Sequence, residues 1–131
     1  MALIEWNNTF SVGISQLDSE HQRLVEMINT LYDAMKQGKG KDAITTLLNE
    51  LSAYVVTHFS HEEKWMQEHS YPQFTEHKKI HDDFVRKVGE YKTMHQKGLL
   101  SANQLLTTLR DWLVSHICHT DSKYGMLQKT S

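Results

Sequence analysis

The sequence lacks several features that would indicate other kinds of protein. Only one of its 131 residues is cysteine, so an internal disulfide is excluded and a reducing compartment is favoured. No apolar run approaches the length of a membrane span, and residues 1–10 lack the pattern of a secretory signal. With a formal net charge of -2 and scattered lysines, the chain has no basic stripe. We therefore expect a cytoplasmic monomer with a small ligand, no nucleic-acid partner and no membrane insertion.

Helix-breaking residues are also scarce, because the chain has one proline and six glycines. Long helices can run between so few breaks, and apolar residues recur three and four positions apart without strand-type alternation. This pattern predicts an all-α fold, an antiparallel up-down-up-down four-helix bundle that forms one domain over residues 1–131. The expected segments are an arm over 1–14, helices at about 16–37, 42–68, 72–97 and 102–118, and an irregular C-terminal segment. Trp6 and Phe10 would hold the arm across the bundle.

Each predicted helix has a candidate start signal. Ser15 and Asp18 resemble a capping box at the first helix, and Asp42 is a plausible N-cap for the second. Pro72 would lie in the first turn of the third helix, and Ser101 precedes the fourth.

Histidine is unusually frequent, with nine in the chain. Histidines and carboxylates interrupt the apolar stripes at positions where the helical pattern requires hydrophobic residues. On the second predicted helix, His58 and Glu62 lie between Leu51 and Trp65 and point the same way, because residues four apart differ by about 40° around a helix. The candidate metal ligands are His21, His58, Glu62, His77, His81, His116 and Asp121.

The bundle topology predicts that these residues meet. The starts of the first and third helices share one end of the bundle with the ends of the second and fourth. His21 and His77 lie near helix starts and Glu62 and His116 near helix ends, within roughly 10 Å of that end at about 1.5 Å per residue. A buried carboxylate without a partner is costly, and a divalent cation removes the penalty. A metal centre is therefore predicted.

Asp121 needs a departure from regular helix geometry. It follows His116 by five residues, which in an α-helix places it about 140° away from that histidine. We therefore predict a π-type turn or a helix end between the two. Five imidazoles and two carboxylates suit two ions that share the carboxylates, because a carboxylate can bridge and a neutral imidazole cannot. Zinc or manganese would accept these ligands as well as iron.

The order and spacing of the candidates carry a resemblance. They read His21, His58-x-x-x-Glu62, His77-x-x-x-His81 and His116-x-x-x-x-Asp121. Together with Trp6 and the V-G-I-S-Q-L-D-S-E-H segment that ends at the first ligand, this pattern resembles the hemerythrin family, specifically its single-domain bacterial members.

The resemblance implies two iron ions per chain, joined by an oxo or hydroxo bridge, that bind dioxygen reversibly at a vacancy on one iron. It implies that His77, His81 and His116 hold one iron, that His21 and His58 hold the other, and that Glu62 and Asp121 bridge them. The expected role is storage, transport or delivery of oxygen to an oxygen-consuming enzyme, without enzymatic activity. The alternative is a di-iron reductase of nitric oxide or peroxide, or an iron donor for repair. The Glu-x-x-His motif of ferritin-like sites is missing.

Other residues have secondary interpretations. Trp112, Leu113 and Ile117, with Leu24 and Phe59, could form a dry oxygen pocket over the open iron. Tyr124 is interpreted as a packing residue and Glu20, Asp82 and Asp83 as part of a solvated face. The histidines left outside the ligand set are His61, His69, His95 and His119.

Overall fold

Four long helices make up the structure, a computed structural model that describes residues 4–7 and 10–124 apart from the side chain of residue 119. In chain order they are α1 (Ser15–Lys36), α2 (Gly40–Glu68), α3 (Phe74–Gln96) and α4 (Ala102–Ser115), and the π-helical segment η2 (His116–Asp121) continues α4. No strand occurs within these described ranges. None of the described helices combines the length and apolar character that crossing a membrane requires.

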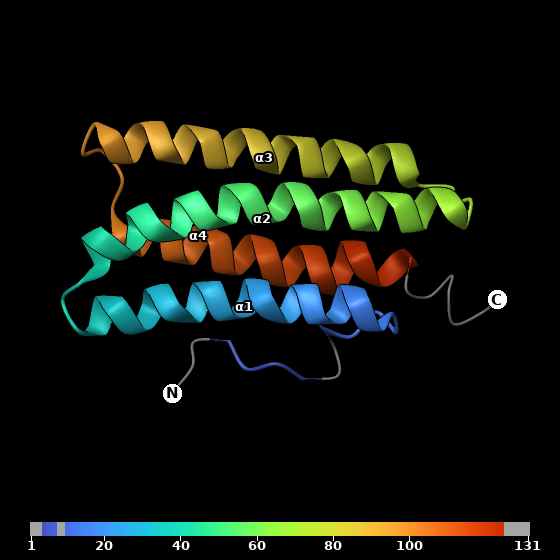
Figure 1. Cartoon of the computed structure of the whole chain (residues 1–131), viewed down its shortest axis with the longest axis horizontal. Helices are drawn as coiled ribbons and strands as arrows, with labels where there is room; N and C mark the ends of the chain where they lie inside the picture. Colours follow the sequence, from blue (N-terminus) through green and yellow to red (C-terminus); the bar gives the residue numbers. More distant parts are fainter. Residues whose placement is uncertain (1–3, 8–9, 125–131) are drawn as a thin grey trace.

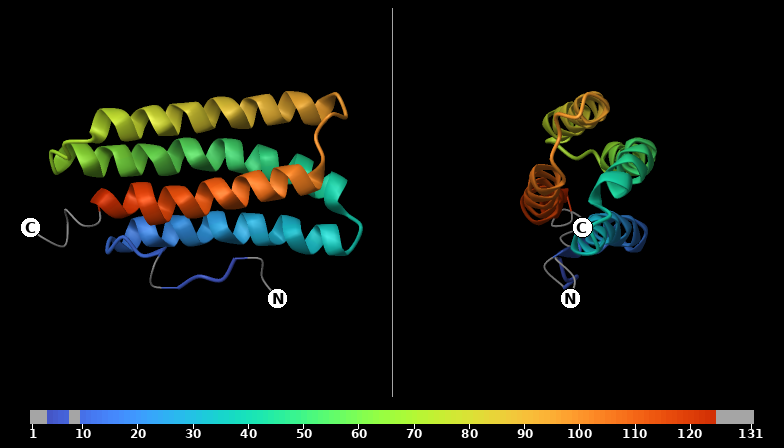
Figure 2. Two further views of the ribbon diagram at one scale, coloured as in Figure 1. Left: turned by 180° about the vertical axis from the view of Figure 1, so that it is seen from behind. Right: turned by 90° about the vertical axis from the view of Figure 1, so that its left-hand side faces the viewer.

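The helices run antiparallel in succession, as Figure 1 shows. Helix α1 packs against α2 and α4, and α2 also packs against α3. Seen along the bundle axis in Figure 2, the four helices surround one common interior. The predicted all-α, up-down-up-down bundle is therefore confirmed.

Apolar side chains fill the interior in two clusters. The main core extends along the bundle and includes the almost fully buried residues Leu31, Leu48, Val88 and Leu105. A smaller group, which we call the end cluster, consists of Val12, Leu17, Met66, Tyr71 and Tyr124. In α2 the buried Glu62 lies between Phe59 of the main core and Met66 of the end cluster. The candidate ligands thus interrupt the apolar interior between the two clusters.

The N-terminal arm is fastened to α1 by backbone and apolar contacts. The side chain of Asn29 accepts a hydrogen bond from the Ile4 amide and donates one to the Ile4 carbonyl, both at 2.9 Å. Phe10 is buried, and its ring stacks on Trp6 with centroids 5.2 Å apart. The arm therefore packs on the bundle, as predicted.

The predicted capping box at Ser15 and Asp18 is wrong. Helix α1 has Ile14 at its N-cap, without a side-chain hydrogen bond, and Ser15 is already helical. Asp18 instead accepts hydrogen bonds from the Val12 amide at 2.8 Å and the Ser11 hydroxyl at 2.6 Å. Because Asp18 binds the arm, it fixes the entry of the chain into α1 and does not cap the helix in the predicted way.

Two other predicted starts shift by two residues. Helix α2 begins at Gly40, so Asp42 lies in its first turn and is not the N-cap. Helix α3 begins at Phe74, because the preceding turn is closed by a hydrogen bond from the Phe74 amide to the Tyr71 carbonyl, which leaves Pro72 outside the helix. The start at Ser101 is confirmed, since its side chain accepts from the Gln104 amide at 3.0 Å.

Candidate metal centre

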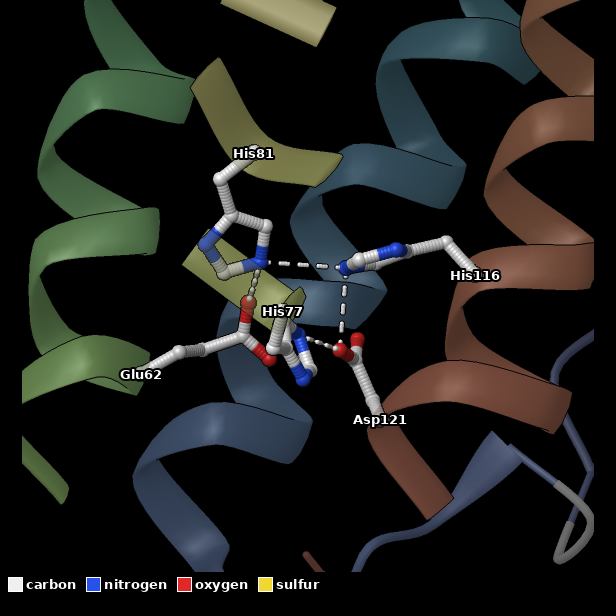
Figure 3. A group of neighbouring side chains, drawn as sticks. All are labelled: Glu62, His77, His81, His116 and Asp121. Carbon is white, nitrogen blue, oxygen red and sulfur yellow. Dashed lines mark hydrogen bonds and ion pairs between the residues drawn. The ribbon is translucent and has the colours of Figure 1, made fainter. Parts of the chain in front are cut away.

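Seven polar side chains, carried by α1, α2, α3 and the η2 segment that continues α4, meet inside the protein. Each is almost completely buried, with exposed fractions between 0% and 4%: His21, His58, Glu62, His77, His81, His116 and Asp121. Figure 3 shows five of them pointing toward one another from α2, α3 and the α4–η2 segment. The structure therefore brings together every residue that the sequence selected as a ligand candidate.

The π-helical segment η2 carries Asp121 into the group. A π-helix advances less than an α-helix per residue around its axis, so a spacing of five returns to the same side. Oδ1 of Asp121 lies 2.9 Å from Nε2 of His116 and 2.9 Å from Nε2 of His77. The predicted irregular turn between His116 and Asp121 is confirmed.

The ligand atoms form two groups of unequal size. In the larger group, one ligand atom from each of five residues lies within 4.8 Å of the others: Glu62, His77, His81, His116 and Asp121. The smaller group consists of His21, His58 and Glu62, whose ligand atoms also lie within 4.8 Å of one another. Glu62 belongs to both groups, which is the position that a bridging carboxylate would take.

The carboxylate oxygens are arranged between the two groups. Oε1 of Glu62 lies 3.2 Å from Nε2 of both His58 and His81, which belong to different groups. Oδ1 of Asp121 faces the larger group, whereas its Oδ2 lies 3.1 Å from Nε2 of His21. Each carboxylate thus touches imidazoles of both groups.

Several of these inward-facing atoms have no hydrogen bond within the described part of the chain. They are Oε1 of Glu62, both carboxylate oxygens of Asp121 and Nε2 of His77. Some lie close to an imidazole nitrogen, but the orientation does not make a hydrogen bond. Leaving buried polar atoms without partners costs about 1–3 kcal/mol each. Cations placed between the two groups would satisfy them, so the donor set fits a pair of metal ions.

A family comparison agrees with this geometry. The model of the hemerythrin HHE cation-binding domain matches residues 12–127. The chain belongs to the hemerythrin family. It is 40% identical over 124 residues to a bacteriohemerythrin of Pseudomonas paraeruginosa, covering 95% of this chain and 80% of that protein. It is also 34% identical over 122 residues to a myohemerythrin of Theromyzon tessulatum, covering 92% and 89% of the two chains.

Solved structures show the same relationship. A crystal structure of wild-type hemerythrin superposes with a TM-score of 0.85 at 32% identity and covers 95% of this chain and 96% of that one. The hemerythrin resemblance inferred from the ligand spacing is therefore confirmed.

A small apolar cavity lies beside this hemerythrin centre. The volume in which the centre of a water-sized molecule can lie is about 10 Å³. This is close to the roughly 10–15 Å³ that a cavity needs to hold one such molecule. Leu24, Trp112 and Leu113, three of the predicted pocket residues, line it with Ile28, Leu51, Phe84 and Leu109.

The other two predicted pocket residues are buried without lining this cavity. The ring of Phe59 stacks on His81 with centroids 3.8 Å apart and also contacts Phe84 and Trp112. Ile117 is only 1% exposed and belongs to the main core. Phe59 therefore lies between the cavity wall and the imidazole cluster.

The buried carboxylates and imidazoles of this candidate centre shift one another's pKa values. Burial lowers the pKa of His21, but the close contacts and negative charges of Asp121 and Glu62 raise it to about 10. Burial likewise lowers the pKa of His81, which contacts with Glu62 and Glu63 raise to about 9. Burial raises the pKa values of Glu62 and Asp121, yet the surrounding imidazoles hold both below their usual range. The carboxylates thus favour the protonated forms of His21 and His81.

Two carboxylates behind the imidazoles were not identified from the sequence. Oε1 of Glu20 lies 2.7 Å from Nδ1 of His58, and Oε2 of Glu63 lies 3.0 Å from Nδ1 of His81. The interpretation of Glu20 as part of a solvated face is wrong, because its side chain is only 15% exposed. An N–H donated from Nδ1 to a carboxylate leaves Nε2 as the lone-pair nitrogen and fixes the direction of the ring. Glu20 and Glu63 therefore orient one imidazole in each group.

We expect Glu20→Ala and Glu63→Ala each to weaken metal binding by about 10- to 100-fold, the range found when such orienting partners are removed. Metal titration of the metal-free protein measures this effect. Glu26→Ala is the matched control, because Glu26 also lies on α1 but its side chain is 66% exposed and pairs with Arg23. Equal affinities for all three variants would contradict the orienting role.

Tyr124 also has a polar role that the sequence did not reveal. It is fully buried in the end cluster, as a packing residue would be, but its hydroxyl donates to Oε2 of Glu62 at 2.5 Å. Burial and the nearby charges of Glu62 and Asp121 raise its pKa well above the usual value. Tyr124 is therefore a neutral donor that holds Glu62 in place.

The histidines outside the ligand set have other partners. Nδ1 of His61 lies 2.5 Å from Oε2 of Glu20, and Nε2 of His95 lies 2.8 Å from the Thr45 hydroxyl. His69 is exposed, and its Nδ1 donates to the Trp65 carbonyl at 2.8 Å. The side chain of His119 lies outside the described residues.

Proposed function

We propose that the chain binds dioxygen reversibly at a carboxylate-bridged pair of iron ions. The observation that carries this proposal is the pair of buried ligand groups with Glu62 in common, of which one contains three histidines and the other two. Membership of the hemerythrin family favours iron over zinc and manganese, which the same ligand types would accept.

The ligand roles follow from the two groups. We propose that Nε2 atoms of His77, His81 and His116 hold one iron, that those of His21 and His58 hold the other, and that Glu62 and Asp121 bridge the pair. When bound, the iron pair supplies reversible two-electron chemistry, an oxo or hydroxo bridge and an open position. His21 and His58 would hold one iron and His77, His81 and His116 the other, so the iron held by His21 and His58 would have fewer protein ligands and could accept a small molecule.

The surrounding residues favour binding over turnover. Every residue that lines the apolar cavity is hydrophobic, and Leu24 follows His21 by less than one helical turn. Such a wall excludes water and offers no group to deliver protons to a bound oxygen molecule. We therefore propose a binding protein and not an enzyme.

The decisive measurement is the visible spectrum of the iron-loaded protein. We expect the reduced protein to be nearly colourless, to gain a strong absorption band on aeration, and to lose that band under vacuum. We also expect two iron ions per chain by metal analysis. A spectrum that does not change on aeration, or that changes irreversibly, would refute reversible binding.

The physiological role that fits this chemistry is storage, transport or delivery of oxygen to an oxygen-consuming enzyme. We propose that the protein acts as a monomer in the cytoplasm, in keeping with its single cysteine.

A further inference from the structure

A groove between α2 and α3 lies at the end of the bundle opposite η2, where α2 begins and α3 ends (Figure 1). It encloses about 300 Å³, the lower limit for pockets that hold small molecules. Apart from the buried Leu48, the residues that line it are polar: Lys41, Thr45, Asn49, Lys92, His95 and Gln96. The groove therefore contains two lysines and a histidine, and none of the residues that line it is acidic.

The positive charge of this groove is not balanced by nearby carboxylates. Neither Lys41 nor Lys92 forms an ion pair with any residue that the structure describes. Asp42 is next to Lys41 in sequence but does not line the groove, and Glu90 pairs with Arg86 at 3.0 Å. Lys92 is half-buried, and a charged group that loses water without gaining a partner is destabilised. A bound anion would supply the missing partner.

Helix-end electrostatics account for only part of this arrangement. Lys92 and His95 lie near the C-terminal end of α3, where a positive charge is favourable beside the negative end of the helix dipole. Lys41 lies in the first turn of α2, where the helix end is itself positive and a further cation is unfavourable. The two helix ends thus bring both lysines to one groove, although only one of them is placed favourably for its own helix.

A polar contact across the groove holds one of its side chains in place. The hydroxyl of Thr45 on α2 lies 2.8 Å from Nε2 of His95 on α3. This contact links the two helices and restricts the orientation of the imidazole. A groove whose groups are already fixed loses less conformational freedom when a ligand binds.

We propose that this groove binds the phosphate group of a small molecule. Two lysines match a phosphate group, whose charge is about −1.5 to −2 at neutral pH, and lysine commonly binds phosphate. The amides of Asn49 and Gln96 offer N–H donors to further oxygen atoms of the ligand. Inorganic phosphate and a phosphate ester share this chemistry. The inference does not depend on the metal centre or on oxygen binding.

Two other grooves of comparable size lack this free positive charge. In the groove between α1 and α2, Arg23 lies 3.9 Å from Glu50, so the guanidinium has an acidic partner. In the groove between α3 and α4, every lining residue is uncharged. Of these three grooves, only the one between α2 and α3 presents cations without an acidic partner.

Isothermal titration calorimetry of the iron-loaded full chain tests the site, in phosphate-free buffer at low ionic strength. The ligands are inorganic phosphate, phenyl phosphate and benzoate, which has the same ring as phenyl phosphate but a single negative charge. We expect one phosphate ligand per chain, with the better of the two phosphates binding roughly tenfold more tightly than benzoate. Both phosphate results support the site: tighter binding of phenyl phosphate indicates an ester, and tighter or equal binding of inorganic phosphate indicates the free ion.

The metal-free chain should bind the same phosphate equally well, because the groove lies at the opposite end of the bundle from the metal centre. Circular dichroism would confirm that its helix content is unchanged. Loss of phosphate binding in a metal-free chain that keeps its helices would place the anion at the metal centre and overturn the proposal.

Substitutions locate the ligand in the groove. Lys41→Gln and Lys92→Gln should each weaken phosphate binding about three- to tenfold, because each removes a charge-assisted hydrogen bond. Thr45→Val should weaken it several-fold without a change in charge, because His95 loses its partner. Lys87→Gln is the matched control, since it removes an exposed lysine of α3 that lies outside the groove, and it should bind like the wild type.

Three results would contradict the phosphate site. They are undetectable binding of both phosphates, benzoate binding as tight as phosphate binding, and a loss of affinity in Lys87→Gln equal to that in Lys92→Gln. The last two would show that the ligand responds to the overall charge of the surface and not to this groove. Iron content and the aeration spectrum test the metal centre separately, so failure of either proposal leaves the other readable.

Discussion

Replacing Glu62 with alanine is expected to lower the iron content of the loaded protein from the proposed two ions per chain to fewer than one. Glu62 is the only residue that belongs to both groups of candidate ligands among the described residues. In the proposed centre, its loss would take one ligand from each ion and remove the carboxylate shared between them. Metal analysis and the visible spectrum after iron loading would measure the effect.

The same substitution should also destabilise the metal-free protein. Oε2 of Glu62 accepts a hydrogen bond from the Tyr124 hydroxyl. The negative charge of Glu62 also stabilises the positive charge of protonated His21, whose pKa it helps to raise. Removing one partner from a buried charged group costs about 3–5 kcal/mol. Denaturant unfolding without metal would show this loss in the free energy of unfolding.

Two further variants sharpen this test. Glu68→Ala changes a glutamate in the last turn of the same helix that is 57% exposed, and it should leave iron content and stability close to the wild-type values. Glu62→Gln keeps the shape and the acceptor for Tyr124 but lacks the charge, so it should restore stability more than iron binding. Two iron ions and an unchanged spectrum in Glu62→Ala would overturn the bridging assignment.

The bundle and the meeting of the seven side chains could be predicted because both depend on periodicity. A ligand-type residue that replaces an apolar one on a helical stripe must face the interior, and the topology sets its depth. His58 and Glu62 are examples, since their exposure of 1% and 0% follows from their places on the stripe of α2. Even the π-helical turn was predictable, because regular geometry could not bring Asp121 back to His116.

Helix starts were less predictable because competing hydrogen bonds decide them. The carboxylate of Asp18 could accept hydrogen bonds from its own helix or from the arm, and it accepts them from the Val12 amide and the Ser11 hydroxyl of the arm. Similarly, Pro72 suits the first turn of a helix, but the turn from Tyr71 to Phe74 delays the start of α3.

The residues behind the candidate ligands could not be predicted from the pattern of any single helix. Glu20 adjoins a ligand in sequence, yet the imidazole that it contacts is His58 on another helix. Tyr124 reaches Glu62 across 62 positions of the chain. The periodicity of one helix does not predict such contacts, because they depend on how neighbouring helices are rotated about their own axes. The sequence offers only a weak signal for these residues. Glu20 and Glu63 are polar residues next to predicted ligands, and Tyr124 follows the last predicted ligand.

Inserting one alanine between Cys118 and residue 119 is expected to remove Asp121 from the centre. The π-helical segment already accommodates one residue more than an α-helix would between His116 and Asp121. With the insertion, the aspartate follows His116 by six residues. The extra residue would turn the carboxylate by about a further 80–100° and leave it facing away from His77 and His116. We expect iron content to fall below half of the wild-type value, with the helix content by circular dichroism unchanged.

Deleting Cys118 provides the opposite test of the same geometry. The deletion shortens the spacing between His116 and the aspartate to four residues, and in a regular α-helix four residues differ by only about 40°. The segment can then become α-helical while the carboxylate still faces the histidines, so this variant should keep far more iron than the insertion. Cys118→Ala preserves the length and should bind iron like the wild type. Similar iron loss in the insertion and the deletion would show that the centre requires the π-helix itself and not the direction in which it points Asp121.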